Sequence, residues 1–126
     1  MEELASIFSG NFLVNSLSNF YESLIIILTQ YDGNNWNALA DSGLIYLISW
    51  VFVIIGIYES FKNRTVSNMI MNFWFIASIL LMFIVEPNIN RLNIIVFPLI
   101  FYTVVGIVSF IDKWNYSSIA IIIIYL

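Results

Sequence analysis

The sequence predicts an all-α integral membrane protein, and its composition and long uncharged runs support this class. Of the 126 residues, 61% are hydrophobic and only 10% are charged, and the mean hydropathy is +0.94. Soluble domains devote about a quarter of their residues to Asp, Glu, Lys and Arg. A chain with so few charges cannot cover itself with a water-compatible surface, so we expect lipid to be its main solvent.

The uncharged runs mark the predicted membrane spans. Three of them hold 17, 21 and 20 residues, and about 20 apolar residues in a helix cross a hydrocarbon core roughly 30 Å thick. We therefore predict three complete transmembrane helices at about 43–61, 67–85 and 92–111. A fourth apolar run, 118–126, reaches only about 14 Å as a helix. We expect an incomplete fourth span, and hence a chain that is a piece of a longer protein.

Residues 12–30 predict a helix of a different kind. Apolar side chains recur there at three- and four-residue spacing, and polar side chains fill the other face, including Asn15, Ser16, Ser18, Asn19, Glu22 and Ser23. This amphipathic pattern suits a helix that lies along the outer membrane interface or against other helices. The alternative is a spanning helix that lines a polar cavity. We assign residues 1–42 to this external helix and its following loop, and residues 43–126 to the transmembrane region.

The basic residues predict how the spans are oriented. Lys62, Arg64 and Lys113 follow the first and third spans, whereas the loop between the second and third spans contains only Arg91. Lys and Arg concentrate in cytoplasmic loops. We therefore expect loops 59–67 and 112–117 in the cytoplasm, and loops 30–42 and 86–93 outside. The composition is rich in Ile and Asn and poor in Ala, which suggests an AT-rich bacterial genome, so we expect the membrane to be a bacterial cytoplasmic membrane.

The missing residue types exclude several kinds of chemistry. The chain has no Cys and therefore no disulfides or thiolate ligands, and it has no His, the commonest metal ligand. Four Lys and Arg residues in a chain of net charge −4 argue against nucleic-acid binding, which needs clustered basic residues. We expect no metal site and no cofactor held by this chain.

The stretch EPNINRLN, residues 86–93, is the main polar island between two apolar runs. The planar guanidinium of Arg91 can donate two parallel hydrogen bonds to a phosphate. Asn88, Asn90 and Asn93 add neutral donors and acceptors beside it. We predict a phosphate contact at Arg91 with these asparagines as neighbours; the alternative is an ordinary helix–helix turn in which Arg91 pairs with Glu86.

Pro98 lies about two helical turns beyond Arg91 in the third predicted span. Proline has no backbone N–H, so it can free a carbonyl group or bend the helix that contains it. Asn72 lies inside the second span, and we expect it to form a helix–helix hydrogen bond.

The segment EPNINRLNIIVFPLIFYTVVGI resembles a part of the GT-C membrane glycosyltransferases, in which a basic residue, a short spacer and a proline enter a late transmembrane helix from outside. The nearest relatives would be of the protein O-mannosyltransferase and aminoarabinose transferase type. Residues 11–59 are similar to the part before it, with an external amphipathic helix, a DG…WN loop and a G-x-x-Y helix entry. The features cover most of the chain in the same order and imply the C-terminal transmembrane portion of such an enzyme.

The resemblance implies transfer of a sugar from a polyprenyl-phosphate carrier to an acceptor outside the cytoplasm. It maps Arg91 to the carrier phosphate and places Asp32, Asn35 and Trp36 in a loop at the site entrance. Leu92 follows Arg91, where many relatives have tyrosine and then two prolines. The family's catalytic acid lies in a first external loop that this chain lacks, so the catalytic residue is unknown. We expect the chain to need a missing N-terminal half or another membrane subunit.

Two other functional classes stay open. A small non-enzymatic membrane subunit or assembly partner would use Arg91 only to pair with Glu86 or a neighbouring chain. A channel or transporter normally has ionisable residues near mid-bilayer, but Glu59, at a cytoplasmic edge, is the only charge in the three predicted spans. Asp32 and Asp41 have the residue type of a general base, although turn and cap roles explain them more simply.

Overall fold

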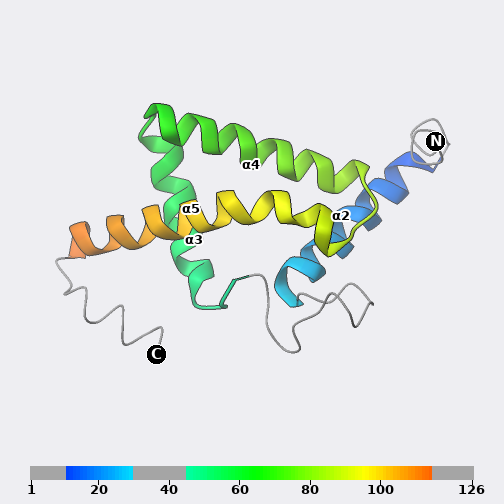
Figure 1. Cartoon of the computed structure of the whole chain (residues 1–126), viewed down its shortest axis with the longest axis horizontal. Coiled ribbons are helices and arrows are strands. Elements are labelled where there is room, and N and C mark those ends of the chain that lie inside the picture. Colours follow the sequence, from blue (N-terminus) through cyan, green and yellow to red (C-terminus); the bar gives the residue numbers. More distant parts are fainter. Residues whose placement is uncertain (1–10, 30–44, 115–126) are drawn as a thin grey trace. The chain divides into compact units, whose positions relative to one another are not determined.

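The computed structural model describes residues 11–29 and 45–114, and the regular structure in these ranges is entirely helical (Figure 1). The all-α class is therefore confirmed for this part of the chain. The predicted entrance loop and the fourth apolar run, 118–126, lie outside the described residues. The helices are α2, Phe12–Thr29; α3, Ser49–Lys62; α4, Val66–Ile84; and α5, Ile89–Trp114.

Three of these helices are long and apolar enough to cross a membrane. Their mean hydropathies are 1.3 for α2, 1.8 for α4 and 2.6 for α5 over Ile89–Lys113. Only 22%, 17% and 28% of the residues in these windows are buried inside the protein. Such extensive exposure of large apolar side chains suits hydrocarbon rather than water, and the chain fits an integral membrane protein.

Helices α4 and α5 match two of the predicted helices, and both are long and apolar enough to cross a membrane. The bounds of α4 differ from the predicted range 67–85 by one residue at each end, and α5 contains the whole predicted range 92–111. At the start of α4, Thr65 Oγ1 accepts the Asn68 N–H at 3.2 Å. This bond is the side-chain cap that satisfies a free donor of the first turn.

The predicted span 43–61 was wrong at its start. Helix α3 begins at Ser49 and has 14 residues, which is about 21 Å at 1.5 Å per residue and shorter than the hydrocarbon core. Residues 45–48 form a bend and a turn instead, and Ile48 at the helix start provides no side-chain cap. The uncharged run predicted the length of the apolar segment, but it contained no signal for the residue at which the helix begins.

The described residues belong to two compact units, and both α4 and α5 contribute to each of them. Unit 1 comprises α2 and the segment Phe75–Val96, which includes the turn between α4 and α5. Unit 2 comprises Tyr46–Trp74, which includes α3, and residues 97–114 of α5.

In unit 1, helix α2 has three distinct faces. Its core face buries Ser16, Ser23, Ile26 and Ile27, and Phe20 stacks on Phe83 of α4 with ring centroids 4.4 Å apart. A second face exposes the apolar residues Leu13, Val14, Leu17, Tyr21, Leu24, Ile25 and Leu28. A third face is exposed and polar, and there Ser18 Oγ donates to Glu22 Oε1 at 3.0 Å. A helix is present over nearly all of the predicted range 12–30, but the structure buries Ser16 and Ser23 of its predicted polar face. Its external position stays a prediction.

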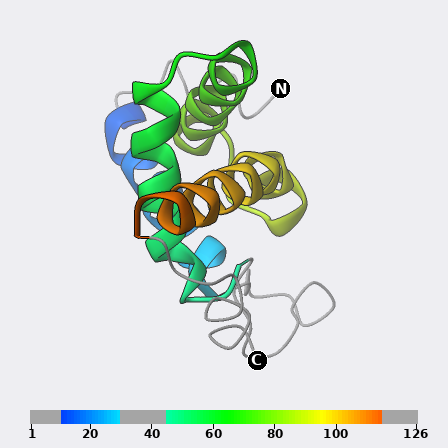
Figure 2. The same cartoon turned by 90° about the vertical axis from the view of Figure 1, so that its left-hand side faces the viewer.

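In unit 2, helices α3 and α5 cross (Figures 1 and 2), and their backbones are in contact there. A Cβ atom added at Gly56 would lie 1.9 Å from the carbonyl oxygen of Tyr102, and one added at Gly106 would lie 1.9 Å from that of Phe52. Neither space can hold even a methyl group. Glycines of this kind let membrane helices approach more closely than larger residues allow.

Asn72 joins the three helices of unit 2. Its Oδ1 accepts hydrogen bonds from Ser60 Oγ at 2.8 Å and from the Tyr102 hydroxyl at 2.9 Å. Both donors are fully buried. The predicted helix–helix hydrogen bond of Asn72 is therefore confirmed, and it connects α4 to both α3 and α5.

Charged residues gather at one end of unit 2. The Lys113 ammonium group donates to the carboxylate of Glu59, which is buried. The ammonium groups of Lys62 and Lys113 lie 5.9 and 6.0 Å from the ring centre of Tyr58. Lys62 and Lys113 thus share one end of this unit, as the predicted orientation requires; that this end is cytoplasmic stays a prediction.

Candidate functional site

The polar island forms a tight turn between α4 and α5. Pro87 cannot donate a backbone hydrogen bond, so it cannot continue a helix from α4. Asn88 then caps α5: its Oδ1 accepts the N–H of Asn90 at 2.9 Å, and its carbonyl oxygen accepts the N–H groups of Arg91 and Leu92 at 3.1 and 3.0 Å. The turn fixes Arg91 in the first turn of α5.

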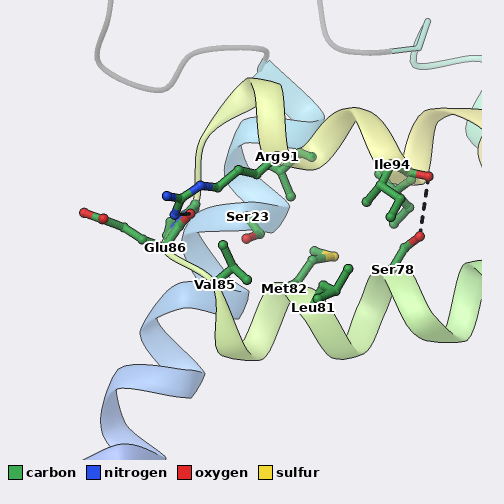
Figure 3. A pocket seen from close by; sticks show the side chains of 11 residues that line it. Ser23, Ser78, Leu81, Met82, Val85, Glu86, Arg91 and Ile94 are labelled. Atoms are coloured by element: carbon green, nitrogen blue, oxygen red, sulfur yellow. Dashed lines mark hydrogen bonds between the residues drawn. The ribbon is translucent and has the colours of Figure 1, made fainter. Parts of the chain in front are cut away.

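A cavity of about 290 Å³ lies beside this turn, within unit 1 (Figure 3). Its walls come from α2, the end of α4, the turn and the start of α5. The polar lining residues are Ser23, Ser78, Glu86 and Arg91; the apolar ones are Leu81, Met82, Val85, Pro87, Leu92, Ile94 and Ile95. Such a cavity is near the lower size limit for small-molecule sites, which are typically apolar with a few polar groups.

Arg91 provides the positive charge of the cavity. Its side chain is exposed, and its Nη1 donates a hydrogen bond to the main-chain carbonyl oxygen of Glu86 at 3.2 Å. Figure 3 shows the Glu86 carboxylate pointing away from the guanidinium group. The contact through the carbonyl positions Arg91 over the turn and leaves the carboxylate at the rim.

Pro98 lies inside α5, and it has no N–H with which to bond the carbonyl group of Ile94, four residues earlier. Ser78 of α4 compensates, and its Oγ donates to the Ile94 carbonyl oxygen at 3.5 Å (Figure 3). Both Ser78 and Ile94 line the cavity. This hydrogen bond joins the two helices at the cavity wall.

Ser23 is the residue of this site that sequence reasoning missed. It is fully buried and lines the cavity, and within the described ranges its Oγ has no hydrogen-bond partner. Leaving a buried hydroxyl group unsatisfied costs roughly 1–3 kcal/mol. The sequence did contain a signal, because Ser16 and Ser23 are seven residues apart and therefore share one helix face, but small residues on a helix face usually serve packing.

The other predicted site residues are placed differently from Arg91. Asn88 is used as the helix cap, and Asn90 and Asn93 are exposed on α5. None of these three asparagines is among the residues that line the cavity. The predicted entrance residues Asp32, Asn35 and Trp36 lie outside the described residues.

Comparisons of the chain with protein-family models, curated proteins and solved structures found no match. The GT-C resemblance therefore depends on the sequence motifs alone.

Proposed function

We propose that this chain is an integral membrane protein that binds the phosphate of a polyprenyl-phosphate lipid in the Arg91 cavity, as the carrier-binding portion of a membrane glycosyltransferase. The observation that carries the proposal is the exposed guanidinium group of Arg91 on a largely apolar cavity. The cavity lies at the ends of α4 and α5, which are both long enough to cross a membrane. The phosphate would accept paired hydrogen bonds from Arg91. The lipid tail would contact apolar walls such as Leu92 and Ile95.

The length of α5 supports this location for a lipid phosphate. Its 26 residues extend about 39 Å, so a helix that crosses the core of roughly 30 Å leaves both ends near the headgroups. Arg91 and Lys113 occupy opposite ends of this helix. With Lys113 in the cytoplasm, Arg91 faces the outside, where the sugar acceptor would be.

The external position of α2 belongs to the same proposal. By length and composition α2 is able to cross a membrane, but Glu22 is exposed near its middle. A charged side chain at the bilayer centre costs roughly 2.5–3.5 kcal/mol on insertion scales. A position along the interface instead lets the apolar face enter the lipid while Glu22 stays in water.

A second candidate is a non-enzymatic membrane subunit or assembly partner. The observation that favours it is the hydrogen bond from Arg91 to the Glu86 carbonyl, which gives the arginine a structural role in the turn. In that case the removal of Arg91 weakens the turn but does not change the affinity of the protein for any lipid. The two candidates therefore differ in a binding measurement.

The test is a titration of the protein with farnesyl phosphate, a short polyprenyl phosphate, in a maltoside detergent that contains no phosphate. Arg91→Ala is expected to weaken binding at least tenfold, since hydrogen bonds to charged groups contribute about 1.5–3 kcal/mol. Arg64→Ala, at an exposed arginine outside the cavity, is the matched control and should keep the wild-type Kd. Equal affinities of the Arg91 variant and the wild type, or no binding to either, would contradict the proposal.

A further inference from the structure

We infer that Ser23 of α2 is a second ligand contact in the Arg91 cavity, and that its hydroxyl group donates a hydrogen bond to an oxygen atom of the bound lipid phosphate. The inference rests on the proposed function, because it assigns a further binding residue to the same ligand. It makes the site a two-point receptor, with a charged group at the rim and a neutral donor in the interior.

The position of Ser23 is the first argument. Arg91 is exposed, whereas Ser23 is fully buried, and both line the same cavity. In Figure 3 the Ser23 side chain projects from α2 into the space between the end of α4 and the start of α5, on the same side of the view as Arg91. A headgroup held at Arg91 that enters the cavity would meet this hydroxyl.

The missing hydrogen bond is the second argument. Within the described ranges, neither the helix backbone nor any neighbouring side chain satisfies Ser23 Oγ. A helical serine often bonds the carbonyl oxygen four residues earlier, but Ser23 does not. Ser78, the other cavity serine, bonds the Ile94 carbonyl. Ser23 therefore keeps its donor available to a group that enters the cavity.

The apolar walls define what kind of oxygen atom reaches Ser23. Leu81 and Ile95 have no polar side-chain atoms, and the thioether of Met82 is only a weak acceptor, so a ligand has to bring its own strong acceptor. A phosphate has several oxygen atoms, and Arg91 can bind at most two of them in its paired arrangement. A remaining oxygen is then available for the neutral hydroxyl group.

The experiment uses the same titration with farnesyl phosphate in maltoside. Ser23→Ala removes the donor and is expected to raise the Kd about tenfold. Ser23→Cys keeps a similar shape, and because a thiol is a weak donor it should also bind more weakly than the wild type. Ser16→Ala is the matched control, since Ser16 is buried and without a partner in the described ranges, yet it does not line the cavity. It should bind as the wild type does.

Thermal unfolding without ligand verifies that each variant folds, and neither alanine variant should unfold at a lower temperature, because each removes an unsatisfied buried hydroxyl. Wild-type affinity in both Ser23 variants, with binding still weakened by Arg91→Ala, would overturn the role of Ser23 and leave the proposed function intact. Equal losses in Ser16→Ala and Ser23→Ala would also overturn it, because the effect would then come from packing of α2. If Arg91→Ala binds as the wild type does, the proposed function fails and the inference fails with it.

Discussion

In apolar surroundings, a side-chain hydrogen bond from Ser78 stands where Pro98 cannot form a backbone hydrogen bond. Proline removes the donor that the Ile94 carbonyl needs, and Ser78 Oγ donates to that oxygen from the next helix. Ser78 is fully buried at the wall of the cavity. The hydrogen bond between Ser78 and Ile94 thereby holds α4 and α5 together beside the cavity.

We predict that Ser78→Ala lowers the free energy of unfolding by about 1 kcal/mol, the usual net contribution of such a hydrogen bond. Unfolding in detergent, followed by circular dichroism, measures the change. Ser67→Ala, at an exposed serine of the same helix, should change stability little. In a Pro98→Ala background the Ile94 carbonyl regains a donor within α5, so the cost of Ser78→Ala should decrease. Equal costs in both backgrounds would contradict this explanation.

In unit 2 the backbones of α3 and α5 are in contact where the two helices cross. The backbone of each glycine, Gly56 and Gly106, lies against a carbonyl group of the other helix. A Cβ atom added at either one would lie 1.9 Å from that carbonyl oxygen. Side chains can rotate away from a new atom, but a backbone carbonyl can only move with its helix. A methyl group at either position therefore forces the two helices apart.

We predict that Gly56→Ala destabilises the protein by about 1–3 kcal/mol, the typical cost of overpacking, although alanine favours the helix itself by up to about 1 kcal/mol. The same denaturation assay measures it, with Ile54→Ala at an exposed position of α3 as the control. Gly56→Ala and Gly106→Ala combined should cost less than their sum, because one separation of the helices relieves both contacts. An unchanged or raised stability in Gly56→Ala would show that the backbones of α3 and α5 leave room for a methyl group at Gly56.

At the same scale, the sequence predicted whole elements better than their edges. Charges on both sides of an apolar run delimit α4 closely, because a charge is expensive in lipid. The start of α3 was not predictable from that signal, since Ile45 and Ile48 are as apolar as the helix that follows. Arg91, which lines the cavity, was predictable as a candidate site residue because its chemistry is rare in this chain. Ser23 was not, because a serine becomes a site residue only where distant helices leave a cavity beside it.

At the scale of the whole molecule, the two ends of α5 carry different groups, and the membrane determines what each end meets. Arg91 lies in the first turn of α5, and Lys113, whose ammonium group pairs with Glu59, lies in its last turn. The exposed apolar side chains between them have lipid as their natural solvent. The orientation of this single helix therefore decides whether the cavity faces the outside.

The absence of native Cys makes the orientation directly testable. We predict that a membrane-impermeant maleimide added to intact cells labels Asn90→Cys but not Asp112→Cys, both exposed positions near opposite ends of α5. Permeabilised cells should label both variants, which controls for reactivity. Labelling of only Asp112→Cys in intact cells would reverse the orientation, and labelling of both would rule out the crossing.

The hydrogen bonds of Asn72 also limit how this protein can vary in sequence. The neighbouring Phe73 is largely exposed and needs only an apolar side chain that can contact lipid, so many apolar residues would be tolerated there. Position 72 must instead offer one acceptor within reach of hydroxyl groups from two other helices. Leucine would remove that acceptor, aspartate would add a charge, and glutamine would displace it by one methylene group. Adjacent residues on one helix thus differ sharply in the freedom they have to mutate, and the cause is a polar group that must fit rather than an apolar group that must pack.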